Sequence, residues 1–332
     1  MEETKHDSGN EGRESHNERQ KEEGMHHHSE SHSSEKFSTK ISRFHDRNYK
    51  KLLILPAIIL VLSFAYMFYF YNAHGDFVQK DISLTGGTSV TINSENLSVQ
   101  KVQSDLSANL SSIDVRSISN LLTGQQKAIV IETTSDANTT RTVLENYLGY
   151  NLTDQNSSFE FTGSSISASF FQQLVIAVIV AFALMALVVF VMFRTFVPSS
   201  AVILSAFADI FMTLAAFNIL GFKLSSSGIV AFLMLIGYSV DTDILLTNRV
   251  LRRHEMSINR KIWGAFKTGM TMVLTSFVAV GLALIVTGPF SKDLTQIFTI
   301  ILIGIGFDIF NTWITNVSII KWYALKKEKH EA

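Results

Sequence analysis

Four acidic residues lie inside segments that are otherwise apolar enough to cross a membrane. Asp209 lies in "AFADIFM", Asp241 and Asp243 lie in "LIGYSVDTDILL", and Asp308 lies in the last apolar segment. A charge in the hydrocarbon layer is costly, so such residues face a protein interior or a water-filled cavity. Carboxyl groups there can gain and lose protons as conformations alternate, which makes a proton relay the functional hypothesis.

Asp241 and Asp243 are too close in sequence to share one helix face. Two positions along an α-helix correspond to a rotation of roughly 200°, so their side chains point in nearly opposite directions. Each acid therefore needs its own partner. We expect Asp241 to join Asp209 and Asp308 inside the bundle, and Asp243 to meet the cytoplasmic edge, Arg249 or another subunit.

The last apolar segment carries polar residues at helical spacing. Asp308, Asn311, Thr312 and Thr315 occupy positions i, i+3, i+4 and i+7, which share one face, and Asn316 is adjacent to it. The predicted intramembrane network consists of Asp209, Asp241, Asp243, Asp308 and Asn311.

Two other uses of these acids stay open. Hydrogen bonds between helices can fix a bundle or a partner subunit, and the small residues Gly237, Gly304 and Gly306 permit close helix approach. Intramembrane proteolysis requires two facing carboxylates that share a proton, but no accompanying signature supports it. We expect no enzyme activity.

Six apolar segments of suitable length dictate the class of protein. They lie near 52–71, 170–193, 198–220, 227–247, 270–288 and 294–320, and about 20 apolar residues suffice to cross a bilayer. The sequence predicts a polytopic α-helical membrane protein. Its parts are a polar tail (1–48), a first transmembrane helix (49–71), an α+β domain (72–169), a five-helix block (170–322) and a C-terminal tail (323–332).

The N-terminal tail has too few apolar residues to fold and is predicted to be disordered. It contains a run of three histidines at 26–28, which allows either a metal-binding tail or a solvated low-complexity one. Because no fixed ligand spacing is present, we predict no metal site. The chain has no cysteine, which excludes disulfides and thiolate chemistry.

The loop between the first two membrane segments has the pattern of a small folded domain. Strands are expected at 88–92, 113–118, 127–133 and 157–163, and helices at 98–110 and 136–150. The order β-α-β-β-α-β indicates a ferredoxin-like domain. It contains no nucleophile motif and no metal-ligand cluster, so a binding or mechanical role is favoured, without a cofactor.

Lysine and arginine placement predicts the orientation. Basic residues gather before the first segment, between the fourth and fifth, and after the sixth, whereas the opposite turns hold only Lys223 and Lys292. Cytoplasmic loops carry this excess, so both termini are expected in the cytoplasm and the α+β domain on the exported side of the cell membrane. A formal net charge of −1 gives no electrostatic footprint for nucleic acid.

Two stretches resemble a known family. "GYSVDTDILL" at 237–246, which includes Gly237 and Tyr238, resembles the fourth-helix signature of SecF, the protein-export membrane protein, in its archaeal form. "DISLTGGTSV" at 81–90 resembles the element with Gly86 and Gly87 that SecD and SecF share. The family is related to the resistance-nodulation-division transporters.

The resemblance implies a role in protein export. It implies SecD as partner, the SecY channel as neighbour, a translocating polypeptide as substrate and contact with membrane lipid. It also implies that intramembrane charges couple polypeptide movement to proton flow, with Asp241 and Asp243 in the motif. A six-helix block is half of a twelve-helix transporter plan, which favours an obligate partner subunit or a homodimer.

Three hypotheses follow. The first is an auxiliary subunit of the Sec export machinery. The second is a subunit of a small-molecule or lipid transporter of related fold. The third is a structural scaffold that stabilises its partner without ion coupling.

Overall fold

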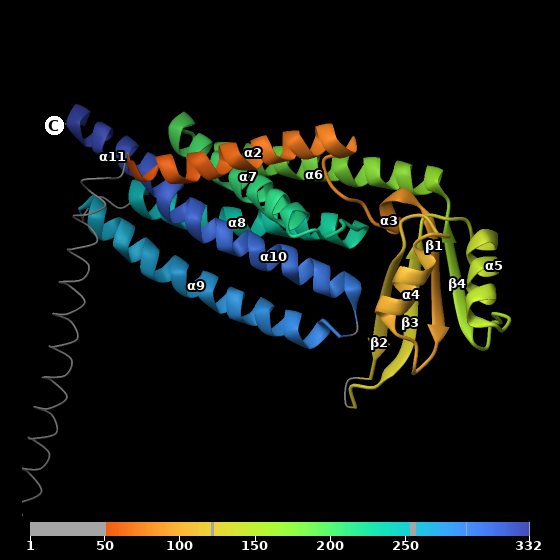
Figure 1. Ribbon diagram of the computed structural model, residues 1–332. Helices are drawn as coiled ribbons and strands as arrows, with labels where there is room; N and C mark the ends of the chain where they lie inside the picture. Colours follow the sequence, from red (N-terminus) through yellow and green to blue (C-terminus); the bar gives the residue numbers. More distant parts are fainter. Residues whose placement is uncertain (1–50, 121–122, 253–256, 290, 332) are drawn as a thin grey trace, which may run out of the picture. The chain divides into compact units, whose positions relative to one another are not determined.

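The computed structural model describes residues 51–120, 123–252, 257–289 and 291–331, so the tail predicted at 1–48 lies outside the described residues. Two parts follow one another in the described chain: long helices and a small α+β domain inserted after the first of them (Figure 1). Six helices in this part of the chain are long and apolar enough to cross a membrane, which confirms the predicted class.

The long helices extend further than their apolar cores. Their bounds are α2 (Ile54–His74), α6 (Ser164–Phe193), α7 (Phe196–Ile219), α8 (Ser226–Arg252), α9 (Ile258–Thr287) and α10 (Lys292–Phe310). A π-helical segment, η1 (Asn311–Asn316), continues α10 into α11 (Val317–Glu331). Hydropathy places the start of α9 near 270, twelve residues late, because its first turns carry Arg260, Lys261 and Lys267.

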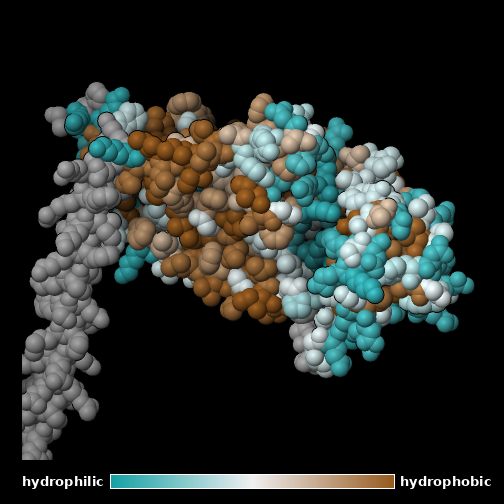
Figure 2. All heavy atoms as spheres, viewed as in Figure 1, coloured by the Kyte–Doolittle hydropathy of each residue, from teal (hydrophilic) through white to brown (hydrophobic). Residues whose placement is uncertain are grey.

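Helices α7, α8 and α10 form the packed centre of the bundle. Leu235 of α8 and Ile305 of α10 are fully buried in one apolar cluster with Met67 of α2. Gly304 of α10 lies directly against Leu235, and a Cβ atom there would overlap its side chain. By contrast, α2, α6 and α9 are largely exposed and apolar, and Figure 2 shows hydrophobic side chains gathered over the helices. Such a surface suits contact with lipid.

The α+β domain has the predicted ferredoxin-like topology. Its elements are β1 (Gly87–Asn93), α4 (Val99–Leu106), β2 (Asp114–Ser119), β3 (Gln126–Thr133), α5 (Ala137–Leu148) and β4 (Ser157–Thr162). The sheet order is β2-β3-β1-β4 with every neighbouring pair antiparallel. Every second residue of β1, such as Val90 and Ile92, is fully buried beneath the helices of the domain. The opposite face of the sheet carries the alternate residues.

Helix α5 begins at a well-formed cap. The Asp136 side chain accepts hydrogen bonds from the backbone N–H groups of Asn138 and Thr139, both at 3.0 Å. The Thr139 hydroxyl also donates to the Asp136 carboxylate at 2.6 Å. These bonds, the hydroxyl first, hold the pKa of Asp136 below its usual value of 3.8. The cap supplies partners for backbone donors that the helix itself cannot satisfy.

The "DISLTGG" element makes the entry into the sheet. Asp81 caps the short helix α3 (Ile82–Thr85) by accepting from the Ser83 backbone N–H at 2.8 Å. Gly86 and Gly87 follow with φ of 81° and 147°. A Cβ on Gly87 would collide with the backbone of Thr133 on β3. Glycine is therefore required here because of the positive φ angles and because two segments of the backbone approach closely.

Candidate functional site: a buried polar cluster between three helices

The membrane helices bring a set of polar side chains together in the interior of the bundle. Asp209 comes from α7, Asp243 from α8 and Asp308 from α10, and all three are 0% exposed. Their partners are Ser239 of α8 and the η1 residues Asn311, Thr312 and Asn316, which are equally buried. We call these seven residues the polar cluster.

Asp209 lies at one end of the polar cluster. Its Oδ1 accepts a hydrogen bond from Asn311 Nδ2 at 2.6 Å, and its Oδ2 accepts one from Ser239 Oγ at 2.5 Å. Both carboxylate oxygens therefore have a donor. These bonds join α7 to α8 and to the π-helical segment. They also give the buried carboxyl group the hydrogen-bond partners that a polar group removed from water requires.

Asp243 and Asp308 meet through a shared hydroxyl. Thr312 Oγ1 lies 2.8 Å from Asp243 Oδ1 and 3.1 Å from Asp308 Oδ1. Asn316 Nδ2 also donates to Asp243 Oδ1 at 2.7 Å. A threonine hydroxyl carries one hydrogen and can donate to only one of the two carboxyl groups. If both contacts are hydrogen bonds, the other carboxyl group must be the donor and carry a proton.

The π-helical segment explains why residues 308, 312 and 316 all serve this site. An i→i+5 hydrogen-bonding pattern widens the turn and reduces the rotation per residue. Asn316 therefore stays close to the face of Asp308 and Thr312, while Asn311 reaches Asp209. Single-turn π segments inside α-helices are frequent at functional sites.

The polar cluster has more acceptors than donors. The oxygens without a hydrogen-bond donor in the described residues are Asp243 Oδ2, Asp308 Oδ2, Asn311 Oδ1 and Asn316 Oδ1. A buried acceptor that lacks a donor carries a desolvation penalty of about 1–3 kcal/mol. The arrangement is thus suited to receive protons or another positively charged species.

The expected positions of Asp241 and Asp243 are reversed. Asp243 belongs to the polar cluster, whereas Asp241 is exposed on the outer face of α8. The prediction that the two acids point apart is confirmed, but the choice of the inner one was wrong. Ser239 and Asp243 are four residues apart and face inward together, so the rotation of α8 turns Asp241 outward.

Arg249 does not meet Asp243 as expected. Its guanidinium donates to the backbone carbonyl of Gly264 and to Thr268 Oγ1, the latter at 3.0 Å. Both partners lie on α9, so Arg249 ties the ends of α8 and α9 together.

Ser239 was not singled out from the sequence. Its i, i+4 relation to Asp243, with Thr242 and Thr247 also buried, is a signal that marks the inner side of α8. The motif residues Gly237 and Tyr238 lie away from that side: Gly237 is exposed and Tyr238 is half-buried. Gly86 and Gly87 lie at the entry to the α+β domain, where they permit a backbone conformation that other residues rarely adopt.

No group of histidine, aspartate and glutamate side chains in the described ranges is arranged to hold a metal ion. The polar cluster supplies hydroxyl and amide groups that form hydrogen bonds, and carboxyl groups that can also bind a proton.

The fold and the site together define a class: a polytopic α-helical membrane protein with a small α+β domain and a buried polar cluster at the bundle centre. The model of the family "Protein export membrane protein SecD/SecF, C-terminal" matches residues 143–326. Protein-export membrane protein SecF of Methanocaldococcus jannaschii is 36% identical over 283 residues, covering 83% of this chain and 96% of that protein. SecF of Pyrococcus furiosus is 32% identical over 283 residues, covering 85% and 93%.

Solved structures show the same fold. SecDF of Thermus thermophilus, described as a translocon-associated membrane protein, matches with a TM-score of 0.64 at 19% identity over 83% of this chain. This chain spans 38% of that longer protein. A SecDF structure in a super-membrane-facing form matches with a TM-score of 0.55. The chain belongs to the SecF family of protein-export membrane proteins and is part of the SecD/SecF translocation machinery.

Proposed function

We propose that this chain acts with SecD beside the SecY channel to promote polypeptide translocation, and that the polar cluster couples this work to proton flow. The observation that carries the proposal is the convergence of Asp209, Asp243 and Asp308 from three helices onto one fully buried site. Three ionisable groups enclosed in a membrane bundle are costly, and such groups mark ion pathways.

The hydrogen-bond inventory supports proton uptake. Thr312 has one hydrogen for two carboxyl groups, and four cluster oxygens have no donor among the described residues. Protons bound to the carboxyl groups would supply the missing donors. Their loss would leave like charges close together without water, so the bundle would rearrange when the protons leave.

Single Asp→Asn substitutions test the coupling. Asparagine keeps the shape of each aspartate and one acceptor oxygen, but it replaces the other oxygen with an NH2 donor and cannot ionise. In vesicles that contain this chain, SecD and the SecY channel, we expect Asp243→Asn and Asp308→Asn to abolish the part of export that depends on a pH gradient. Asp241→Asn is the matched control on the same helix and should retain gradient dependence.

Three outcomes would contradict the proton proposal. If Asp209→Asn, Asp243→Asn and Asp308→Asn all assemble and retain gradient-dependent export, the polar cluster is a scaffold. If export follows a sodium gradient and not a pH gradient, the coupling ion is wrong. If the purified protein carries a specific lipid or small molecule and no export subunits, a transporter of related fold is the better interpretation.

The outer face of α8 supports the partner assignment. Val230, Met234, Gly237 and Asp241 are exposed and follow one another at i, i+4, i+7 and i+11, a single stripe along the helix. A carboxylate on a membrane helix cannot face lipid at reasonable cost. We propose that a helix of SecD covers this stripe, with a hydrogen-bond donor opposite Asp241 and close approach at Gly237.

Bulk at Gly237 tests this interface. A Cβ atom at Gly237 would meet no atom within 4 Å in this subunit. We therefore expect Gly237→Leu to leave the isolated subunit folded but to reduce co-purification of SecD. Undiminished recovery of SecD with Gly237→Leu would place the interface elsewhere.

The proposed localisation is the cell membrane, with both termini cytoplasmic and the α+β domain exported. The absence of cysteine makes the test direct. A cysteine introduced at exposed Lys101 of α4 should react with a membrane-impermeant thiol reagent added to intact cells. Reaction only after the cells are opened would reverse the orientation.

A further inference from the structure

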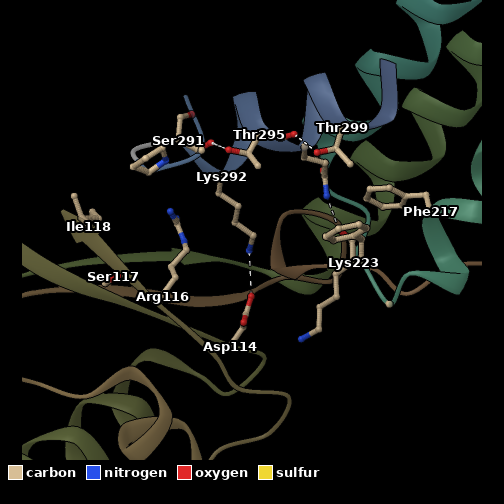
Figure 3. A pocket seen from close by; sticks show the side chains of 15 residues that line it. Asp114, Arg116, Ser117, Ile118, Phe217, Lys223, Ser291, Lys292, Thr295 and Thr299 are labelled. Carbon is tan, nitrogen blue, oxygen red and sulfur yellow. Dashed lines mark hydrogen bonds and ion pairs between the residues drawn. The ribbon is translucent and has the colours of Figure 1, made fainter. Parts of the chain in front are cut away.

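Lys292, the first residue of α10, binds three carboxylates of the segment that contains the α+β domain. Its Nζ lies 3.5 Å from Asp81 Oδ2 and 3.5 Å from Asp114 Oδ2, and it bonds directly to Glu132 Oε2. Asp81 caps α3, Asp114 begins β2 and Glu132 lies on β3. Figure 3 shows the lysine reaching from the end of α10 toward Asp114.

The burial of this ion cluster makes the lysine hard to replace. The side chains of Asp81 and Glu132 are 7% and 10% exposed. Without Lys292, three carboxylates would lie close together, two of them almost without water, and breaking a buried ion cluster is strongly destabilising. Arg116 reaches Glu132 at 3.4 Å, but both belong to the α+β domain. In the described residues, every ion pair between this segment and a membrane helix uses Lys292.

Hydrogen bonds next to Lys292 join the starts of α8 and α10. Gln296, one turn further along α10, accepts from the Ser225 backbone N–H at 3.0 Å and donates to the Lys223 carbonyl at 2.5 Å. Ser227 Oγ donates to Asp293 Oδ1 at 2.8 Å. The two helices that supply Asp243 and Asp308 are therefore tied at the end nearest the domain.

The chain that enters the domain is tied to the same place. The Asp81 N–H donates to the Leu224 carbonyl at 2.9 Å, and the Leu224 N–H donates to the Gln79 carbonyl at 2.6 Å. Ser226 N–H donates to Ser83 Oγ at 3.0 Å. Asp81 thus receives Lys292 from α10 while its backbone pairs with the start of α8.

A cavity of about 420 Å³ lies beside this junction, between β2 and the helix ends (Figure 3). Arg116, Phe217, Lys223, Lys292 and Thr295 are among the residues that line it. Lys223 has no ion pair in the described part of the chain, which makes it a matched control for the charge of Lys292.

Displacement of α10 at Lys292 has a direct route to the polar cluster. Asp308 lies 16 residues, or about 24 Å, further along the same helix. Close packing at Gly304 against Leu235, and at Gly228 against Gln296, prevents α10 from sliding freely along α8. Hydrogen bonds require a narrow range of donor–acceptor distances and angles, so a displacement of α10 would disturb those made by Asp308 and Thr312.

We infer that Lys292 is a positioning residue: it seats the α+β domain on α10 and so fixes Asp308, Asn311 and Thr312 opposite Asp209 and Asp243. The positioning role of Lys292 does not depend on the proposed function; only its effect on protein export does. A force on the α+β domain would reach α10 through the Lys292 ion pairs, so Lys292 would connect the domain to the intramembrane acids.

The cysteine-free chain allows two readouts on the full-length protein in lipid nanodiscs. Spin labels at Lys101→Cys on α4 and Leu282→Cys on α9 report the distance between the domain and the bundle; both positions are exposed. A separate Thr315→Cys reporter, 8% exposed, gives a thiol-labelling rate within η1, the segment that carries Asn311, Thr312 and Asn316 of the polar cluster.

With Lys292→Met, we expect a longer and broader distance distribution and labelling of Thr315→Cys that is about tenfold faster, because local opening controls labelling. Lys292→Arg should restore both readouts, since it keeps the charge. Lys223→Met should change neither. If Lys292→Met does not fold, Asp114→Asn removes the most exposed carboxylate of the ion cluster and should produce the same changes at smaller size.

An unchanged distance distribution in Lys292→Met would show that the lysine does not seat the domain. A changed distance with an unchanged labelling rate would show that the seating does not reach the polar cluster. Either result overturns the inference. Neither readout needs a gradient or an export substrate, so normal export by the Asp→Asn variants would refute the proton proposal and leave this experiment decisive.

Discussion

Asp241 and Asp243 of α8 have the same side chain and are separated by a single residue, yet they lie in opposite environments. Asp243 is fully buried and accepts hydrogen bonds from Thr312 and Asn316. Asp241 is exposed on a stripe with Gly237 and Met234. The inner side of α8 contacts polar groups of α7 and η1 in this chain, whereas we propose that the outer side is covered by a partner subunit.

The largest expected difference between the two sides comes from leucine substitutions. Asp243→Leu leaves the Asn316 amide without its acceptor and forces a larger side chain into the polar cluster. We expect the free energy of unfolding to fall by about 2–4 kcal/mol. Asp241→Leu places an apolar group on an exposed membrane face and should leave the isolated subunit as stable as before. Thermal unfolding of the purified subunits measures both, and equal destabilisation would remove the distinction between the faces.

A matched glycine pair sharpens the comparison through packing. Gly304→Ala puts a methyl group into Leu235, which is 0% exposed and has little room to move. Overpacking of this kind costs about 1–3 kcal/mol. Gly237→Ala adds the same group where nothing lies within 4 Å, so only the helix propensity gain of about 1 kcal/mol applies. A lower melting temperature for Gly237→Ala than for Gly304→Ala would contradict the assigned faces.

Two threonines of η1 test the hydrogen bonds alone. Thr312 Oγ1 contacts both Asp243 and Asp308, whereas Thr315 Oγ1 has no hydrogen-bond partner in the described residues. We expect Thr312→Val to cost about 1–2 kcal/mol because carboxylate oxygens lose a donor. Thr315→Val should be neutral or slightly stabilising. If both variants unfold at the wild-type temperature, Thr312 does not hold the two acids together.

The smallest effect is expected far from the bundle, at the solvent-exposed cap of α5. The pKa of Asp136 is lowered in the folded protein, so its contribution is present above the unfolded value and lost as pH falls through the folded one. At neutral pH, Asp136→Ala should slightly lower the melting temperature of the domain, and this difference should disappear in acid. Asp136→Asn keeps the cap without the charge, so its melting temperature should vary less between neutral pH and acid.

Much of the fold follows from local pattern. Six apolar segments and the alternation of strands and amphipathic helices in the domain predicted the class and the ferredoxin-like order, because both depend on periodicity along the chain. Segment ends were less accurate where charged turns extend a membrane helix, as at Arg260 and Lys261. Those turns are helical because the backbone hydrogen bonding of α9 continues through them, and a hydropathy pattern does not detect this.

The candidate site was predictable only in part. Asp209, Asp243, Asp308 and Asn311 were all in the predicted network, and the structure brings them together. Asp241 was in the same prediction and lies outside. Lys292 was noted only as a lysine in a short turn, and nothing in its neighbourhood in the sequence signals contact with Asp81, Asp114 and Glu132.

The sequence by itself determined which residue types are embedded in membrane helices and that Asp241 and Asp243 cannot share a face, since helical rotation is a local property. The tertiary structure decided which of the two faces inward, because that depends on the rotation of α8 against α7 and α10. It also decided the partners of Thr312 through the π-helical widening after Asp308. Contacts such as that of Lys292 with Glu132 join residues 160 positions apart, and only the packing of domain against helix brings them together.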